Sequence, residues 1–334
     1  MNIQQIFWNA NEKRLRAFWR LAVQGIIIFL LAFITGLISG LIIVLLTNSN
    51  ISQVGYALTS NVISIIVAGI LFIVGPILGA IFIDRRDKAS FGFSFTSQWW
   101  KDFGFGLLLG AVLMSIIFLI EVAFGWATVK GFWRQEGGNY PFYIGFAIVL
   151  FQYLLVGIYE ETFFRGYLMT NLSEGFAFIK NQKAGLFVAY ILSSSIFGIL
   201  HAMNPNATVI STVNIVLAGL FLGLGFVLSG NLAISIGLHI TWNFFQGTVF
   251  GFAVSGMENV ISVIDSVQGG HQLITGGDFG PEAGIIGIFA MILGSALIYF
   301  WVKWQYGEVR LGIIDNFVKA NPPIEETIST KEIL

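Results

Sequence analysis

Three short polar groups interrupt long apolar stretches of this sequence, and their residue types could support hydrolysis. Glu160 and Glu161 follow an apolar run over residues 142–158 that carries no charge. His201 and His239 are two of only three histidines, and both fall in later apolar runs; Asn243 follows four positions after His239. Ionisable groups inside a membrane helix cost roughly 2.5–3.5 kcal/mol each, so their presence needs a reason.

The two adjacent glutamates have different neighbours if their segment is helical. Glu161 and Arg165 are four positions apart, so they share a helix face and can form an ion pair. Glu160 lies about 100° round the helix, and the residue four positions after it is Phe164. We therefore predict that Glu161 is neutralised structurally by Arg165, whereas Glu160 is free for chemistry.

Glu160, His201, His239 and Asn243 together suit two ways of activating water. In the first, Glu160 acts as general base on the water, and an imidazole or amide stabilises the oxyanion that forms. In the second, Glu160, His201 and His239 bind a divalent metal such as Zn²⁺, which activates the water. The residue types fit both, but Asn243 is an uncommon zinc ligand and is better placed as a hydrogen-bond donor, which favours the metal-independent route slightly.

Each polar group also has a structural explanation when it is taken alone. A single His in a span is more often a packed hydrogen-bonding residue than a catalyst, and Asn often links helices. Their joint occurrence favours a functional site, because each polar group in lipid carries its own cost. Glu121 is expected to reach the interface near the outer end of its span, and His271 is assigned no role.

The three groups resemble, in order, the motifs of a known family. Residues 160–165 (Glu-Glu-Thr-Phe-Phe-Arg) match EExxxR, Phe197 to His201 match FxxxH, and His239 to Asn243 match HxxxN. These motifs are typical of the CPBP group, which comprises the type II CAAX prenyl endopeptidases, their bacterial relatives, and the Abi and bacteriocin self-immunity proteins. The resemblance covers about residues 146–247, and no motif position departs from the pattern.

The resemblance implies a protease core with a role for each motif residue. Members of the family have been described both as metalloproteases and as metal-independent glutamate proteases, so the resemblance leaves the metal open. The implied roles are general base for Glu160, its partner in water activation for His201, oxyanion stabilisation for His239 and Asn243, and support of the site for Glu161 and Arg165.

The composition indicates an integral membrane protein. Of the 334 residues, 56% are hydrophobic and only 10% are charged, against about 25% charged in soluble domains. The absence of cysteine excludes disulfides, thiolate metal sites and a cysteine nucleophile. The net charge of −1 and the lack of a basic tract give no reason to expect a nucleic-acid partner.

The apolar runs predict an all-α bundle of about eight transmembrane helices around an intramembrane polar cavity, each run being long enough for an apolar layer about 30 Å thick. Residues 1–20 are expected to form an amphipathic interfacial segment, 21–304 the membrane domain and 305–334 a cytoplasmic tail. On a rise of about 1.5 Å per residue, His239 lies nearer the inner face than His201, so tilt or a shifted helix start must bring them to one depth. The predicted spans are residues 21–46, 62–83, 103–127, 142–170, 184–203, 208–228, 232–254 and 284–304.

The distribution of Lys and Arg predicts the orientation of these spans. With the N-terminus inside, 15 of the 17 basic residues fall in inner segments, and only Lys130 and Arg134 fall in outer ones. Such an asymmetry predicts that both termini are cytoplasmic and that the acidic loop over residues 255–283 faces outward.

We interpret the sequence as an intramembrane endopeptidase that hydrolyses peptide bonds of membrane-associated substrates, CAAX-like ones among them. Its expected partners are membrane lipids and a peptide or protein substrate. The alternative is a non-enzymatic immunity or scaffold protein of the same family, which binds a partner in the same cavity. A transporter would explain intramembrane polar residues but not the ordered motifs, and the HExxH and GxSG motifs of other intramembrane proteases are absent.

Overall fold

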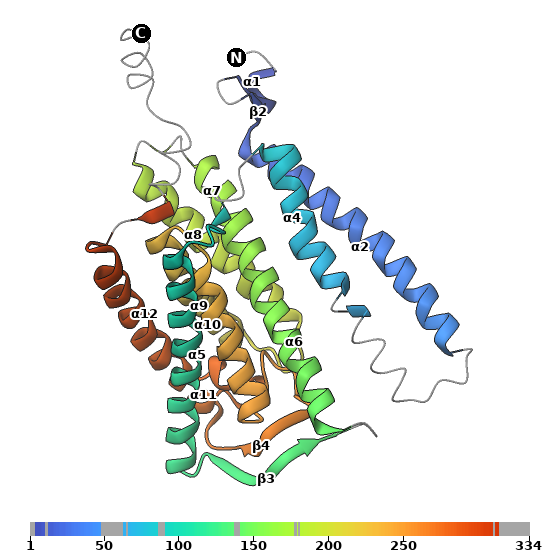
Figure 1. Cartoon of the computed structure of the whole chain (residues 1–334), viewed down its shortest axis with the longest axis vertical. Helices are drawn as coiled ribbons and strands as arrows, with labels where there is room; N and C mark the ends of the chain where they lie inside the picture. The colour runs from blue at the N-terminus through green and yellow to red at the C-terminus, as the bar shows by residue number, and fades with distance from the viewer. Residues whose placement is uncertain are drawn as a thin grey trace.

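The computed structural model describes residues 4–10, 13–47, 63–64, 66–85, 91–136, 141–176, 179, 181–309 and 311–313. This part of the chain is mostly helical, and its long helices run side by side between the end that carries α1 and β2 and the end that carries β3 and β4 (Figure 1). The bulk of the predicted tail lies outside the described residues. At the other end of the chain, α1 (Gln4–Phe7) and the short strands β1 (Trp8–Asn9) and β2 (Arg14–Leu15) precede the first long helix.

Seven helical segments of the described chain are long and apolar enough to cross a membrane. The protein is therefore a multi-pass integral membrane protein. The longest segment is continuous over 34 residues and contains the two glutamates near its middle. The seven segments are α2 (Ala17–Thr47); η1 (Ile70–Val74), α4 (Gly75–Leu78) and η2 (Gly79–Asp84) in one; α5 (Ser97–Ala123); α6 (Phe142–Glu161), η4 (Thr162–Met169) and α7 (Thr170–Gly175) in one; α8 (Gln182–Leu200) with η5 (His201–Met203); α9 (Val209–Ser229); and α12 (Ile285–Tyr306).

The eighth predicted span is a shorter helix at the centre of the bundle. It consists of α10 (Ala233–Phe244) and η6 (Phe245–Val249), and every residue from 231 to 240 is buried. Gly106 of α5 and Gly237 of α10 lie against each other's helix backbone, where a Cβ would collide with main-chain atoms. Because α10 is enclosed by protein, it needs neither the length nor the lipid-facing surface of a spanning helix. The expectation of about eight helices is therefore close.

A two-stranded antiparallel sheet lies outside the helical bundle and was not predicted. The expected third span reached residue 127, but α5 ends at Ala123, and Gly125 adopts a positive φ of 72° that turns the chain away. β3 (Ala127–Gln135) follows and pairs with β4 (Ile261–Gln268), Ala127 lying opposite Gln268. The acidic loop thus contains a strand as well as α11 (Gln272–Thr275), η7 (Gly277–Phe279) and η8 (Pro281–Ala283).

Glu121 does not reach the interface as expected. Its side chain is fully buried, and both carboxylate oxygens accept hydrogen bonds from Nε2 of Gln268, at 2.9 and 2.8 Å. The unpredicted strand β4 supplies Gln268, so the sequence offered no partner for the carboxylate other than water.

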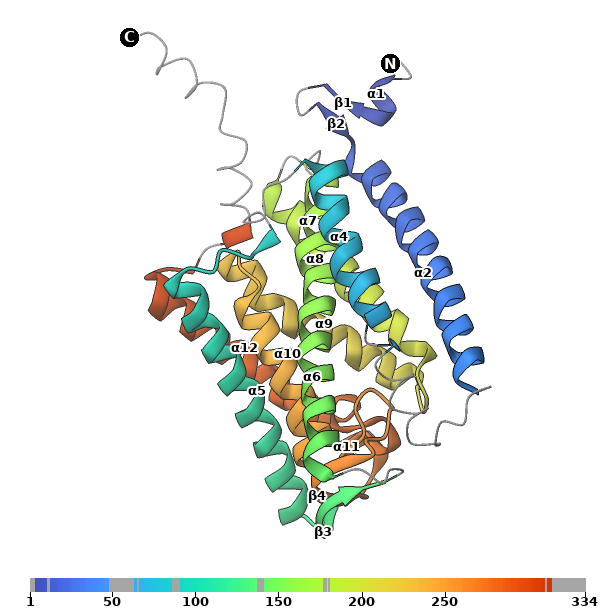
Figure 2. The ribbon, with the colours of Figure 1, turned by 45° about the vertical axis from the view of Figure 1, so that its right-hand side comes forward.

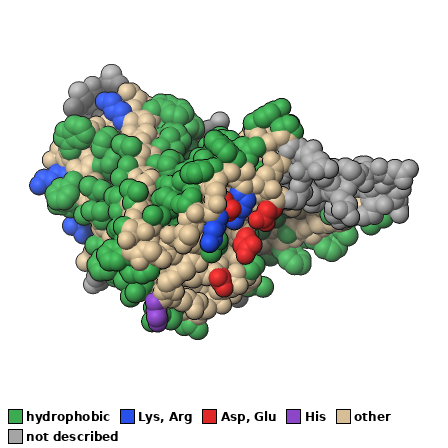
Figure 3. Space-filling model, turned by 90° about the horizontal axis from the view of Figure 1, so that it is seen from below, with side chains coloured by type: hydrophobic (Ala, Val, Ile, Leu, Met, Phe, Trp, Pro, Cys, Tyr) green, Lys and Arg blue, Asp and Glu red, His purple; other side chains and the backbone are tan. Residues whose placement is uncertain are grey.

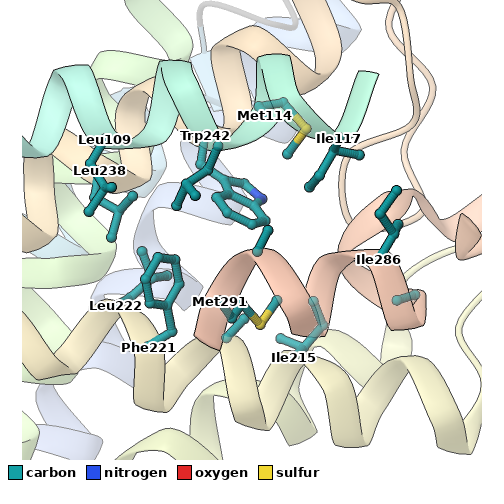
Figure 4. Close-up of a cluster of buried hydrophobic side chains, with 14 of the residues drawn as sticks. Leu109, Met114, Ile117, Ile215, Phe221, Leu222, Leu238, Trp242, Ile286 and Met291 are labelled. Carbon is teal, nitrogen blue, oxygen red and sulfur yellow. The ribbon is translucent and has the colours of Figure 1, made fainter. Parts of the chain in front are cut away.

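The main hydrophobic core lies between α5, α9, α10 and α12. Figure 4 shows Met114 of α5, Phe221 of α9, Trp242 of α10 and Met291 of α12 converging on one another. Many large apolar side chains on the outer faces remain exposed, Phe29 and Phe289 among them. This arrangement, apolar both inside and outside, is what a bundle surrounded by lipid requires.

The first two segments lie to one side of the core helices (Figure 2) and are attached by buried charges near one end. Nη2 of Arg20 lies 2.6 Å from Oε2 of Glu174, and Nη1 of Arg14 donates to the carbonyl of Asp84 at 2.9 Å. The Asp84 carboxylate accepts a hydrogen bond from Asn171 at 2.7 Å. α2 and η2 are thereby joined to α7.

Candidate active site

Two glycines allow close helix contacts around the motif residues. A Cβ on Gly157 of α6 would press on Ile240 of α10, and a Cβ on Gly198 of α8 would collide with Val216 of α9. The close approach of α6 to α10 places the two glutamates beside His239. After Glu161 the helix widens into the π-helix η4, a feature that often occurs at functional sites.

Glu161 forms the predicted ion pair with Arg165 and a second contact that was not predicted. Its Oε1 lies 2.8 Å from Nη1 of Arg165 and also 2.7 Å from Nδ1 of His239. The guanidinium also donates to the carbonyl of Gly219 at 2.9 Å and lies 4.7 Å from the centre of the Phe197 ring. Glu161 and Arg165 are almost completely buried. This network therefore links α6, η4, α8, α9 and α10, and it fixes the ring of His239.

Glu160 faces a different direction, as the helix-face argument predicted. Its nearest basic group is Nε2 of His239, at 3.7 Å from Oε2, which is too long for a hydrogen bond. Oε2 is buried and has no hydrogen-bond partner among the described residues. Glu160 also lines a cavity, so one carboxylate is used inside the protein while its neighbour is presented to that space.

His201 stands at the end of α8, in the first position of η5. Its Nδ1 lies 2.8 Å from the carbonyl oxygen of Phe197. A carbonyl can only accept a hydrogen bond, so Nδ1 carries the proton and Nε2 is the nitrogen left for a ligand. The Phe197 ring contacts both His201 and His239, at centroid distances of 4.6 and 6.3 Å, so one aromatic ring packs against both imidazoles.

The four residues predicted to be catalytic all line one cavity of about 610 Å³. Asn243 is half-buried there, and no hydrogen bond to its side-chain amide occurs within the described chain. Apolar residues of α6 and α9, together with Met291 of α12, form much of the remaining wall. The difference in depth that the sequence implied does not keep His201 and His239 apart, since both line this cavity. The α6–α7 helix continues to Gly175, five residues beyond the predicted end.

The loop after η6 contributes lining residues that sequence reasoning missed. Asn259 is held by the hydroxyl of Tyr153, which donates to its Oδ1 at 2.6 Å, and Glu258 stands exposed beside it. Glu282 is buried, and its carboxylate accepts from the Ser255 N–H at 2.6 Å and from the side-chain amide of Gln246. Burial raises the pKa of Glu282 to about 7, against the opposing effect of these hydrogen bonds. No motif or spacing marks these residues, because the loop that carries them returns to the cavity only in the folded chain.

Glu160, His201 and His239, which the sequence suggested as ligands if a metal binds, do not form a ligand cluster. Within the described ranges, no group of three or more His, Cys, Asp or Glu side chains is arranged to hold a metal ion. The residues present therefore do not fit a metal in this conformation.

Residues 142–245 match the Rce1-like family, type II CAAX prenyl endopeptidase. The chain carries an Rce1-like domain. All seven motif residues lie inside the match, from Glu160 to Asn243, and so does every residue of the buried Glu161 network. Comparison with curated proteins and with solved structures gave no match.

The Rce1-like domain comprises α6 to α10, whereas the remaining helices and the sheet lie outside the matched residues. Glu258 and Glu282 also lie outside it. The cavity is thus shared: its motif residues come from the Rce1-like domain, and part of its rim comes from the acidic loop.

Proposed function

We propose that the chain is an intramembrane endopeptidase that hydrolyses peptide bonds of membrane-associated substrates, with Glu160 as general base. The observation that carries this proposal is that Glu160 has an unpartnered buried oxygen in the same cavity as His201, His239 and Asn243. A pure binding protein has little need for such a group, because an unpaired carboxylate in a membrane protein is costly. The Rce1-like domain belongs to a family of membrane-embedded CAAX endopeptidases, which agrees with this chemistry.

In the proposed reaction, a water molecule attacks the carbonyl carbon of the scissile bond. Glu160 takes one proton from the water as the new C–O bond forms, and the carbonyl π electrons move to oxygen. Nε2 of His201 accepts a hydrogen bond from the other water hydrogen and so orients the attack, because Nδ1 is engaged with the Phe197 carbonyl.

The oxyanion would be stabilised by His239 and Asn243. When His239 is protonated on both nitrogens, Nε2 donates to the oxyanion and Nδ1 donates to Glu161 at 2.7 Å. The Asn243 amide supplies the second donor. When the intermediate collapses, the carbonyl re-forms, the C–N bond breaks, and Glu160 returns its proton to the leaving amine nitrogen. The products are one carboxylic acid and one amine.

Glu161 and Arg165 would act as positioning residues. Because Oε1 of Glu161 is shared between Arg165 and His239, the pair orients the imidazole. Neither residue lines the cavity.

The direct test is cleavage of a peptide library by the purified full-length protein, with products identified by mass spectrometry. We expect cuts at defined bonds with wild type and none with Glu160→Gln at equal protein concentration. Cleavage that survives in Glu160→Gln would reject Glu160 as the base. Absence of cleavage with wild type, together with retention of one peptide on the protein, would favour the immunity or scaffold alternative.

We also propose that both termini are cytoplasmic, on the basis of the Lys and Arg distribution. A reporter that is active only in the cytoplasm should be active when it is fused after Trp304. The same reporter inserted after Asp278 should be inactive, because that position should lie on the opposite side. A Trp304 fusion active only outside would reverse the orientation.

A further inference from the structure

A tight turn at the start of the acidic loop, residues 254–257, forms part of the cavity wall. The N–H groups of Val254 and Met257 each donate to the other residue's carbonyl at 2.9 Å. Between them, Ser255 and Gly256 have positive φ angles of 49° and 82°. A Cβ on Gly256 would collide with the carbonyl of Pro205, so the turn fits closely against the segment after η5. A left-handed conformation is uncommon for a residue such as Ser255, so the surrounding contacts must hold it.

The Ser255 peptide is held from both sides by polar side chains. Its N–H donates to Oε1 of Glu282 at 2.6 Å, and its carbonyl accepts from Nδ2 of Asn204 at 2.9 Å. Asn204 lies three residues after His201, and its own N–H donates to the His201 carbonyl at 3.1 Å, which closes η5. One peptide unit therefore connects Glu282 to the turn that His201 begins.

Packing contributes little to the position of that turn. Ala202 is exposed, and the side chain of Met203 is 90% exposed. Helix ends with few buried contacts fray readily. Asn206 donates to carbonyls of the acidic loop only at 3.3 Å, so the shorter hydrogen bond from Asn204 is the main attachment of this turn to the loop.

Glu282 also holds the helix that carries Asn243. Its Oε2 accepts a hydrogen bond from Nε2 of Gln246, which also donates to the Ala253 carbonyl at 2.6 Å. Gln246 is completely buried in η6, three residues after Asn243 and on the continuation of the helix that carries His239. Because the Asn243 amide has no partner within the described chain, its position depends on the backbone that Gln246 fixes.

The carboxylate of Glu282 acts inside the protein. Figure 3 shows acidic side chains exposed on the face at the end that carries β3 and β4, whereas Glu282 is only 3% exposed and lines the cavity. Burying a carboxylate is costly unless it is hydrogen-bonded. Here both bonds go to segments that lead to proposed active-site residues, although Glu282 itself lies outside the Rce1-like match.

Resting on the proposed endopeptidase function, we propose that Glu282 and Asn204 are positioning residues that act through the Ser255 peptide. Together they set the separation between His201, which orients the water, and Asn243, which stabilises the oxyanion. Neither takes part in the proton transfers. The Rce1-like domain therefore needs the acidic loop to complete its active site.

The test is steady-state cleavage of one peptide that the wild-type protein cuts, at pH 8, above the pKa of Glu282 of about 7. Full-length Asn204→Ala, Glu282→Gln and the double variant are compared with wild type, and rates are expressed per folded molecule. We expect each single variant to lower kcat by about tenfold with KM within about threefold of wild type, because misplaced groups impair the transition state more than substrate binding. The double variant should lose little more than either single one, because both substitutions release the same peptide.

Glu121→Gln is the matched control for Glu282→Gln. Glu121 is also a buried carboxylate, and it accepts hydrogen bonds from Gln268 of the same loop, but it does not line the cavity. The control should lower the melting temperature and keep the wild-type kcat per folded molecule.

A spin label measures the position of the turn without any substrate. The chain contains no cysteine, so a label attached at Met203→Cys is unique, and the side chain it replaces is exposed. The label should become more mobile in Asn204→Ala and in Glu282→Gln, but not in Glu121→Gln. If Glu282→Gln does not fold, Asn204→Ala still gives both the kinetic and the spectroscopic result.

A wild-type kcat in the folded single variants, or a double variant whose loss is the product of the two single losses, would overturn this inference while leaving the protease function intact. Equal loss of kcat in Glu121→Gln, or a label whose mobility does not change, would overturn it as well. If wild type cleaves no peptide, the proposed function fails and this inference fails with it.

Discussion

Two carboxylates of this protein have opposite surroundings. Asp102 of α5 is fully buried and accepts four hydrogen bonds, from Gln98 at 3.0 Å, Asn231 at 3.1 Å, Trp301 at 2.8 Å and Tyr306 at 2.6 Å. Glu160 has no hydrogen-bond donor within the described chain, and its closest basic atom is 3.7 Å away.

The difference separates a structural carboxylate from one kept for chemistry. The donors around Asp102 come from α5, the α9–α10 connection and α12, so the group links three parts of the bundle and leaves no lone pair for a ligand. Glu160 has no donor from the described chain and faces the cavity, so its carboxylate oxygens are available to a water molecule or a substrate.

The adjacent Glu161 sharpens the comparison, because it combines structural and positioning roles. Glu161→Gln leaves Arg165 without its counter-charge in a buried site, which should lower the free energy of unfolding by about 3–5 kcal/mol. Thermal stability and yield in detergent measure the effect, and the charge-restoring Glu161→Asp should recover part of both. A Glu161→Gln protein as stable as wild type would show that Glu161 has no structural role.

Asn243 tests whether the polar groups that line the cavity act in catalysis. Asn243→Ala removes one proposed oxyanion donor, which should lower kcat by about 10²–10³ with little change in KM. Thr241→Val on the same helix is the matched control, since the Thr241 hydroxyl donates to the Gly237 carbonyl and does not line the cavity. If both variants lose activity equally, Asn243 acts through packing and not on the oxyanion.

Glu282 provides a smaller, pH-dependent effect. Its pKa is raised from 4.5 to about 7 by burial, so the folded protein holds this proton more tightly than the unfolded chain. This tighter binding adds up to about 3 kcal/mol to the free energy of unfolding. The contribution is fully present below about pH 4.5 and is lost as the pH rises through about 7.

Melting temperatures of wild type and Glu282→Gln at pH 5, 6, 7 and 8 isolate this contribution. The variant keeps a neutral side chain at every pH, so wild type should lose stability relative to it as the pH rises. A difference between the two proteins that does not change with pH would contradict the assignment.

The sequence predicted the helices and the motif contacts that depend on local geometry. The Glu161–Arg165 pair follows from a spacing of four residues on one helix, and the structure confirms it. Long apolar runs predicted the spans because lipid demands them. The contact between Glu161 and His239 could not be predicted, because it joins residues 78 positions apart and depends on how closely α6 approaches α10.

The parts that sequence reasoning missed lie where the chain leaves the membrane. β3 shows no regular alternation of apolar and polar residues, and its partner β4 follows only after more than a hundred residues, so no local pattern marks the pairing. The loop that contains β4 also folds back onto the cavity, and it brings Glu258, Asn259 and Glu282 there. α10 is shorter than the span predicted over residues 232–254 and is enclosed by protein, which the sequence could not show, because an apolar helix buried in protein has the same composition as one buried in lipid.

The most direct test of the comparison is a side-by-side measurement of Glu160→Gln and Asp102→Asn in purified protein, each assayed for kcat/KM and thermal stability. We predict that Glu160→Gln melts like wild type and loses about 10²–10⁴ in kcat/KM, the usual contribution of a general base. Asp102→Asn should lose about 1–3 kcal/mol of stability, because donors in its cluster lose an acceptor, and should keep its activity per folded molecule. A stable Glu160→Gln protein with near wild-type cleavage would contradict the central claim that Glu160 is the catalytic base.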